Sequence, residues 1–142
     1  MSVSKIGVLG AGQMGSGIAQ VSLQSGLLVV LNDVSDAILD RSRAGIAKGL
    51  DILVRKEKIT AQEKEKALSG LQASTDFAAF ASCDLVVEAA TEREELKLSL
   101  FRKLDAAVPA GRILATNTSS ISITKIAAAT NRPAQEIGRA HV

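Results

Sequence analysis

The stretch IGVLGAGQMG, residues 6–15, decides the fold of this 142-residue chain. Its first four residues form a short apolar run, which is typical of a buried strand that ends in a tight turn. The next six, Gly10 to Gly15, match the spacing G-x-G-x-x-G. Small and apolar residues follow Gly15, and they indicate a helix that packs closely on a sheet and ends near Gly26. The stretch therefore predicts a strand, a turn and a helix in immediate succession.

The same alternation of strands and helices continues outward from this stretch. Ser35 predicts a helix N-cap, and Thr60 with Glu63 predicts a capping box, so that two helices form a hairpin inserted into the α/β pattern. We expect strands at residues 6–9, 27–31, 72–75, 84–89 and 113–116, helices at residues 16–26, 36–54, 61–68, 94–106 and 122–129, and a turn or brief helix at 76–81. This order predicts a doubly wound α/β domain with a mostly parallel sheet and right-handed crossovers.

Composition excludes several classes of function. The 17 basic and 15 acidic residues give a net charge of +2. The electric field of so small a net charge is too weak to attract polyanions. Three aromatic residues offer no platform for stacking bases, so nucleic acid is not expected as a partner. One Cys and one His are too few for a disulfide or a metal site. No apolar run approaches the roughly 18 residues of a membrane span, and we expect a soluble, cytoplasmic protein.

The glycine cluster occurs in the context that binds dinucleotides, between a strand and a helix. The first glycine permits the tight turn, the second lets the backbone approach a pyrophosphate, and the third lets helix and strand pack closely. Backbone N–H groups at the helix start would then face the phosphates. The expected cofactor-binding residues of this turn are Gly10, Ala11, Gly12, Gln13, Met14 and Gly15.

Asp33 follows the second predicted strand, where a carboxylate can accept hydrogen bonds from an adenosine ribose. The same negative charge would repel a 2′-phosphate, and no Arg or Lys follows within the next few residues to neutralise one. We therefore predict NAD as the cofactor in place of NADP. In the alternative interpretation, the glycines form only a close-packed turn and Asp33 is a solvated cap.

Two polar segments follow later strands, at the edge where a doubly wound sheet binds ligands. Residues 88–93 contain Glu92, and Lys97 lies one turn into the next helix. Residues 117–122 form a run of hydroxyl and amide side chains that begins at Asn117. Turn and capping chemistry would also explain the second segment, and a surface ion pair would explain Glu92 and Lys97.

The sequence resembles the NAD-binding (Rossmann) domain of the 3-hydroxyacyl-CoA dehydrogenases from about Lys5 to Gly138. The stretches that carry the resemblance are IGVLGAGQMGSGIAQ (6–20), LVVLNDVS (28–35), VRKEKIT (54–60), DLVVEAATEREELK (84–97) and ILATNTSSISIT (113–124). The resemblance implies an oxidoreductase of fatty acid β-oxidation that passes hydride from the C3 hydroxyl of an acyl-CoA to NAD. A full-length member is expected to form a homo-oligomer.

The resemblance also implies roles for individual residues. Glu92 and Lys97 match residues that contact the nicotinamide side of the cofactor. Asn117 and Ser119 lie in a loop near the cofactor, and Ser119 matches a serine that contacts substrate and cofactor beside the reacting carbon, which makes it the expected catalytic residue. Lys56 aligns with a lysine that helps hold the charged end of CoA, although a solvated charge explains Lys56 equally well.

The chain departs from the family pattern at its last four residues. The position of the family's catalytic histidine is occupied by Ala140, and His141 comes one place late. We therefore expect an NAD-binding domain over residues 1–138, a divergent tail over 139–142, no C-terminal helical domain, and a truncated form with little activity alone. The alternatives are a non-catalytic NAD-binding sensor or structural module, and a related β-hydroxyacid dehydrogenase.

Overall fold

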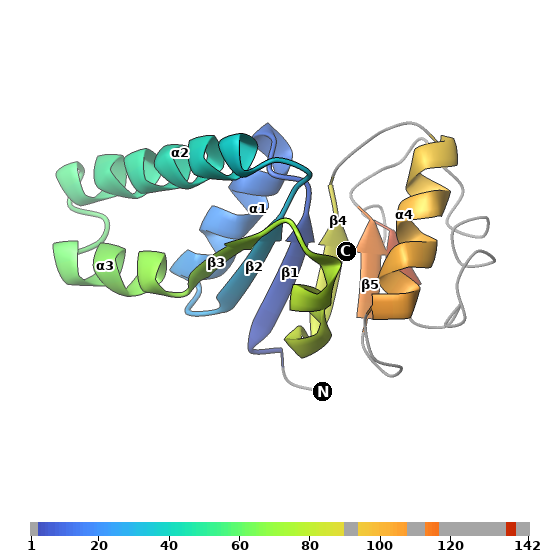
Figure 1. Ribbon diagram of the computed structural model, residues 1–142. Coiled ribbons are helices and arrows are strands. Elements are labelled where there is room, and N and C mark those ends of the chain that lie inside the picture. The colour runs from blue at the N-terminus through green and yellow to red at the C-terminus, as the bar shows by residue number, and fades with distance from the viewer. Residues whose placement is uncertain (1–2, 90–93, 108–112, 117–135, 139–142) are drawn as a thin grey trace.

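The computed structural model describes residues 3–89, 94–107, 113–116 and 136–138, and these residues build a parallel sheet with helices on both faces (Figure 1). The sheet has six strands in the order β3-β2-β1-β4-β5-β6, and every neighbouring pair is parallel. The strands are β1 (Lys5–Leu9), β2 (Leu28–Asn32), β3 (Leu71–Ser74), β4 (Leu85–Glu88), β5 (Ile113–Thr116) and β6 (Glu136–Gly138). The helices are α1 (Gln13–Gln24), α2 (Asp36–Arg55), α3 (Ala61–Ser69), the 3₁₀ helix η1 (Phe77–Ser82) and α4 (Glu94–Ala107).

One face of the sheet is covered by α1, α2 and α3. Residues that alternate along β1 and β2, such as Val8 and Leu31, are fully buried against apolar residues of these helices. Helix α2 contributes Leu39, Ile46 and Leu50 to this core, at the spacing expected for one face of an amphipathic helix. The α2–α3 hairpin extends beyond the edge strand β3 (Figure 1).

The opposite face carries a smaller core built from η1 and α4. Phe80 of η1 and Leu104 of α4 are fully buried there with Val30 and Val86 of the sheet. Gly7 makes room for the aromatic ring, because a Cβ at this position would lie 2.5 Å from a ring carbon of Phe80. The helices that connect β1, β2 and β3 therefore cover one face, and the helices that connect β3, β4 and β5 cover the other. This is the doubly wound arrangement.

Local side-chain chemistry sets the ends of the hairpin helices. The Ser35 hydroxyl accepts hydrogen bonds from the backbone N–H groups of residues 37 and 38 at the start of α2. Thr60 and Glu63 form the reciprocal bonds of a capping box at α3. Between them, Glu57 takes a left-handed conformation with φ 60°, and its N–H donates to the Val54 carbonyl in a Schellman turn that ends α2.

The predicted doubly wound fold with its inserted hairpin is confirmed, and most differences are shifts at element ends. Helix α1 begins at Gln13, three residues earlier than expected, and β2 and β3 are each displaced by one residue. Strand β6 was not predicted, because its three residues contain one apolar side chain and give no periodic signal. The helix expected at 122–129 lies outside the described residues.

Candidate functional site

The carboxyl ends of the parallel strands meet at one edge of the sheet, and the glycine turn lies there. Leu9, the last residue of β1, is in register with Asn32 on one side and with Glu88 on the other. Gly10 then turns the chain with φ 109°, a left-handed conformation that favours glycine. Its N–H donates to the Asn32 carbonyl at 2.7 Å. The turn is thereby fixed to the neighbouring strand before α1 begins.

The other two glycines of the motif have contrasting surroundings. A Cβ at Gly15 would lie 1.7 Å from the Gly10 carbonyl oxygen, so only glycine allows α1 to approach the strand end this closely. A Cβ at Gly12 would meet no atom of the described chain within 4 Å. Packing among the described residues therefore explains Gly15 but not Gly12, and Gly12 is the glycine whose lack of a side chain lets a pyrophosphate approach the backbone in dinucleotide-binding turns.

Asp33 is half-buried directly after β2, and both of its carboxylate oxygens accept backbone hydrogen bonds. Oδ2 accepts from the Ala11 N–H at 2.8 Å, and Oδ1 accepts from the Val34 N–H at 2.7 Å. The carboxylate thus contacts the glycine turn from 22 positions away. Each oxygen has a second lone pair, so ribose hydroxyls can still donate to it. The glycine turn and the Asp33 carboxylate together form a cradle that fits the pyrophosphate and the adenosine ribose of a dinucleotide.

A groove of about 500 Å³ lies between α1 and α2 and opens beside the glycine turn. Its lining includes Gly12 and Ser16 from the turn and α1, and Arg41 and Ser42 from α2. Arg41 lies eight positions after Asp33, so the sequence alone did not place it beside the glycine turn. The available signal was helical spacing, since Ile38, Arg41 and Gly45 recur on one face of α2.

The other predicted site residues are distributed over the chain. Gln13 and Met14 are exposed in the first turn of α1. Lys97 falls within α4. Lys56 is the exposed C-cap of α2 at the hairpin tip, and the length of this 20-residue helix separates it from Asp33 by roughly 30 Å. Glu92, Asn117, Ser119, Ala140 and His141 lie outside the described residues.

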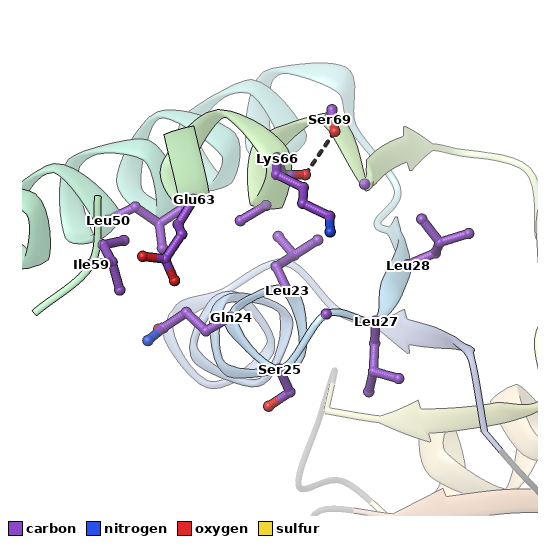
Figure 2. Close-up of a pocket in the computed structure, with 13 residues that line it drawn as sticks. Leu23, Gln24, Ser25, Leu27, Leu28, Leu50, Ile59, Glu63, Lys66 and Ser69 are labelled. Atoms are coloured by element: carbon purple, nitrogen blue, oxygen red, sulfur yellow. Dashed lines mark hydrogen bonds between the residues drawn. The ribbon is translucent and has the colours of Figure 1, made fainter. Parts of the chain in front are cut away.

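A second cavity, of about 360 Å³, lies between α3 and the C-terminal end of α1 (Figure 2). Leu23 and Leu28 line its apolar part, and Glu63 and Lys66 of α3 stand at its polar side. The cavity is at the amino ends of the strands, opposite the glycine turn. Doubly wound sheets bind their ligands at the carboxyl ends, so this cavity is separate from the dinucleotide cradle.

Comparison with known proteins identifies the family. Residues 5–142 match the model of the 3-hydroxyacyl-CoA dehydrogenase NAD-binding domain. The chain belongs to this family. It has the Rossmann fold of this NAD-binding domain, and the resemblance and the NAD cofactor predicted from the sequence are confirmed.

Relatives and solved structures agree with the family match. The chain is 50% identical over 134 residues to a probable 3-hydroxybutyryl-CoA dehydrogenase of Deinococcus radiodurans, covering 94% of this chain and 48% of that protein. The 3-hydroxybutyryl-CoA dehydrogenase of Bradyrhizobium diazoefficiens is 48% identical over 136 residues, with 96% and 46% covered. The crystal structure of (S)-3-hydroxybutyryl-CoA dehydrogenase from Ralstonia eutropha superposes with a TM-score of 0.94 at 44% identity, covering 96% of this chain and 48% of that one.

The chain spans about half the length of the curated relatives it matches. Within the described part of the chain, no helix combines the length and the apolar character that crossing a bilayer requires.

Proposed function

We propose that this chain is the NAD-binding part of an enzyme that transfers hydride between the C3 hydroxyl of a 3-hydroxyacyl-CoA and NAD. The names of its relatives support this substrate class, since they include 3-hydroxybutyryl-CoA dehydrogenases that are 41–50% identical to the chain. NAD, when bound, supplies the acceptor for the hydride. The side chains of this protein hold the cofactor and the substrate in place.

In this proposal, the adenosine half lies on the glycine turn and Asp33 accepts hydrogen bonds from its ribose. The pyrophosphate contacts the backbone at Gly12, where the open side of the glycine supports a close approach. Glu92 and Lys97 contact the nicotinamide side. Asn117 and Ser119 follow β5, and Ser119 contacts the substrate near the reacting carbon.

Lys56 is proposed to contact the charged end of CoA. Its position supports this role, because it is an exposed cation at the hairpin tip and lies roughly 30 Å from the glycine turn along α2. Replacing Lys56 with Ala would weaken CoA binding and leave NADH binding unchanged.

The observation that carries the proposal is the bond between Asp33 and Ala11. It places the acid of the second strand directly against the glycine turn, and a close-packed turn alone does not require a carboxylate there. The test is a fluorescence titration of the chain with NADH. We expect saturable binding that NAD displaces, and the absence of binding at millimolar NADH would contradict the proposal.

Turnover is a separate measurement. The position that matches the family's catalytic histidine holds Ala140, and a missing general base typically costs about 10²- to 10⁴-fold in rate. We therefore expect the chain alone to bind NADH but to form it only slowly from NAD and 3-hydroxybutyryl-CoA. Rates that are ordinary for dehydrogenases, about 1–10³ s⁻¹, would overturn the expectation of low activity and leave the binding proposal intact.

A further inference from the structure

The cavity between α3 and the C-terminal end of α1, named the α1–α3 cavity, lies far from the glycine turn. The 12 residues of α1 separate the two by roughly 18 Å. The volume of the cavity, about 360 Å³, falls within the range of about 300–1,000 Å³ in which proteins bind small molecules. The cavity is therefore a candidate site for a second ligand, independent of the proposed function.

Apolar side chains line much of the α1–α3 cavity. Leu23 of α1, Leu50 of α2 and Ala67 of α3 are buried and contribute to the lining. Leu28 also lines it and is 51% exposed, although the other four residues of β2 are buried. This exposed leucine leaves apolar area in contact with water beside a concave surface. The hydrocarbon part of a ligand would cover that area favourably.

Most of the uncharged polar groups in the lining already have partners within the protein. The Ser25 and Ser69 hydroxyls donate to backbone carbonyls of their own helices, at 3.0 and 2.6 Å. The backbone N–H groups of Gly26 and Gly70 donate to carbonyls of the preceding helical turns. The Gln24 amide oxygen accepts from another side chain of α1. The groups left to bind a polar ligand are therefore chiefly the charged side chains.

Two charged side chains of opposite sign, Glu63 and Lys66, line the cavity. They are three residues apart on α3, which places them on one face of the helix, and in Figure 2 their charged ends lie on opposite sides of Leu23. Within the described part of the chain, neither side chain takes part in an ion pair. One Glu63 oxygen accepts from the Thr60 N–H at 3.0 Å, and its second oxygen can accept from a ligand.

This pair of charges determines the class of ligand. A simple anion attracted by Lys66 would also meet the carboxylate of Glu63, and a simple cation would meet the ammonium of Lys66. A molecule that carries both charges avoids either repulsion. We propose that the α1–α3 cavity binds a small zwitterion with an apolar body, which is the chemistry of an apolar α-amino acid. The ligand carboxylate contacts Lys66, its ammonium contacts Glu63, and its hydrocarbon part covers Leu23 and Leu28.

The test is a titration with L-leucine, followed by amide NMR spectra of the isotopically labelled chain. We expect saturable shifts of the Gly26 and Gly70 amides, which line the cavity, and no shifts at the glycine turn. Three probes each lack one part of the ligand: isocaproate lacks the ammonium, isoamylamine lacks the carboxylate, and free glycine lacks the apolar body. Each should bind about fivefold or more weakly than L-leucine, because each loses one of the three contacts.

Two substitutions remove the charges one at a time. Lys66→Gln removes the cation, and Glu63→Gln removes the anion while glutamine preserves the capping box of α3. Each should weaken L-leucine binding by about fivefold or more. Lys58→Gln and Glu65→Gln are the matched controls, because both residues are exposed and neither lines the cavity. NADH affinity should stay the same in all four variants.

Each other outcome counts against the site. The absence of saturable shifts up to about 10 mM L-leucine, or shifts at the glycine turn in place of Gly26 and Gly70, would overturn it. Isocaproate or isoamylamine binding as tightly as L-leucine would exclude a zwitterion site, and control variants that weaken binding as much as Lys66→Gln or Glu63→Gln would exclude the assigned contacts. NADH binding is measured separately, so failure of this site would leave the proposed function intact.

Discussion

Gly15 and Gly17 lie two residues apart in α1, and the structure predicts opposite effects for the same substitution. A Cβ at Gly15 would lie 1.7 Å from the Gly10 carbonyl oxygen, whereas a Cβ at Gly17 would meet none of the described residues within 4 Å. Real Cβ contacts essentially never fall below 3.0 Å, so in Gly15→Ala the helix and the turn must separate by about 1.3 Å (3.0 minus 1.7). The opposing atom belongs to the backbone, and no rotamer change relieves the contact.

The magnitudes follow from packing and helix propensity. Overpacking a core costs about 1–3 kcal/mol, and a clash between two backbone segments places Gly15→Ala at the upper end. Alanine also favours the helix over glycine by about 1 kcal/mol. The free energy of unfolding should therefore fall by about 2 kcal/mol, which lowers Tm by about 4–8 °C. Gly17→Ala keeps only the favourable part and should raise the free energy of unfolding by about 0.5–1 kcal/mol.

The assay is thermal unfolding of both variants and the wild type, followed by circular dichroism at 222 nm. We expect Gly15→Ala to melt below the wild type and Gly17→Ala slightly above it. Gly15→Ala should also lose NADH affinity, because its helix start moves away from the turn. Equal melting temperatures for the two variants would refute the close contact between Gly15 and Gly10.

Three further substitutions test other parts of the structure. Asp33→Ala removes the acceptor for the Ala11 N–H and should weaken NADH binding. It should also reduce the ratio of NADH affinity to NADPH affinity, and an unchanged ratio would show that Asp33 does not contact the ribose. Glu57→Gly removes the strain of a side chain in the left-handed conformation at the end of α2, and it should raise the free energy of unfolding in urea by about 1 kcal/mol. An increase of the same size in Glu57→Ala would exclude this cause. Thr60→Ala breaks the capping box and should cost about 1 kcal/mol, and an unchanged unfolding midpoint would contradict that value.

Features with a local cause could be predicted from the sequence. The Ser35 cap and the Thr60 capping box depend on side chains that bond to backbone within three residues, so their sequence pattern is sufficient. The first strand and the glycine turn were predicted for a similar reason, because the buried run and the glycine spacing are contiguous. Strand β6 has no such pattern, and its pairing with β5 depends on the rest of the sheet.

Contacts across the fold could be predicted only in part. The sequence placed Asp33 near an adenosine ribose, but it did not reveal that the carboxylate also accepts from the Ala11 N–H. It placed Glu88 both at the end of the buried strand 84–89 and at the start of the polar segment 88–93, and did not decide between the two. The structure makes it the fully buried end of β4, because strand alternation turns it to the same face as Val86. The position of Arg41 beside the turn likewise requires the packing of α2 on α1.

The central claim is that the glycine turn is a cradle for the pyrophosphate, and Gly12→Ala tests it most directly. The backbone of Gly12, with φ −75° and ψ −164°, suits alanine, and a Cβ there meets no atom within 4 Å in the part of the chain that the structure describes. The fold should therefore persist with a Tm loss below about 4 °C. In an NADH titration against the control Gly45→Ala, we predict that Gly12→Ala weakens binding by about tenfold or more, since a methyl group would occupy the place of the pyrophosphate. A folded Gly12→Ala chain that binds NADH as tightly as wild type would contradict the account.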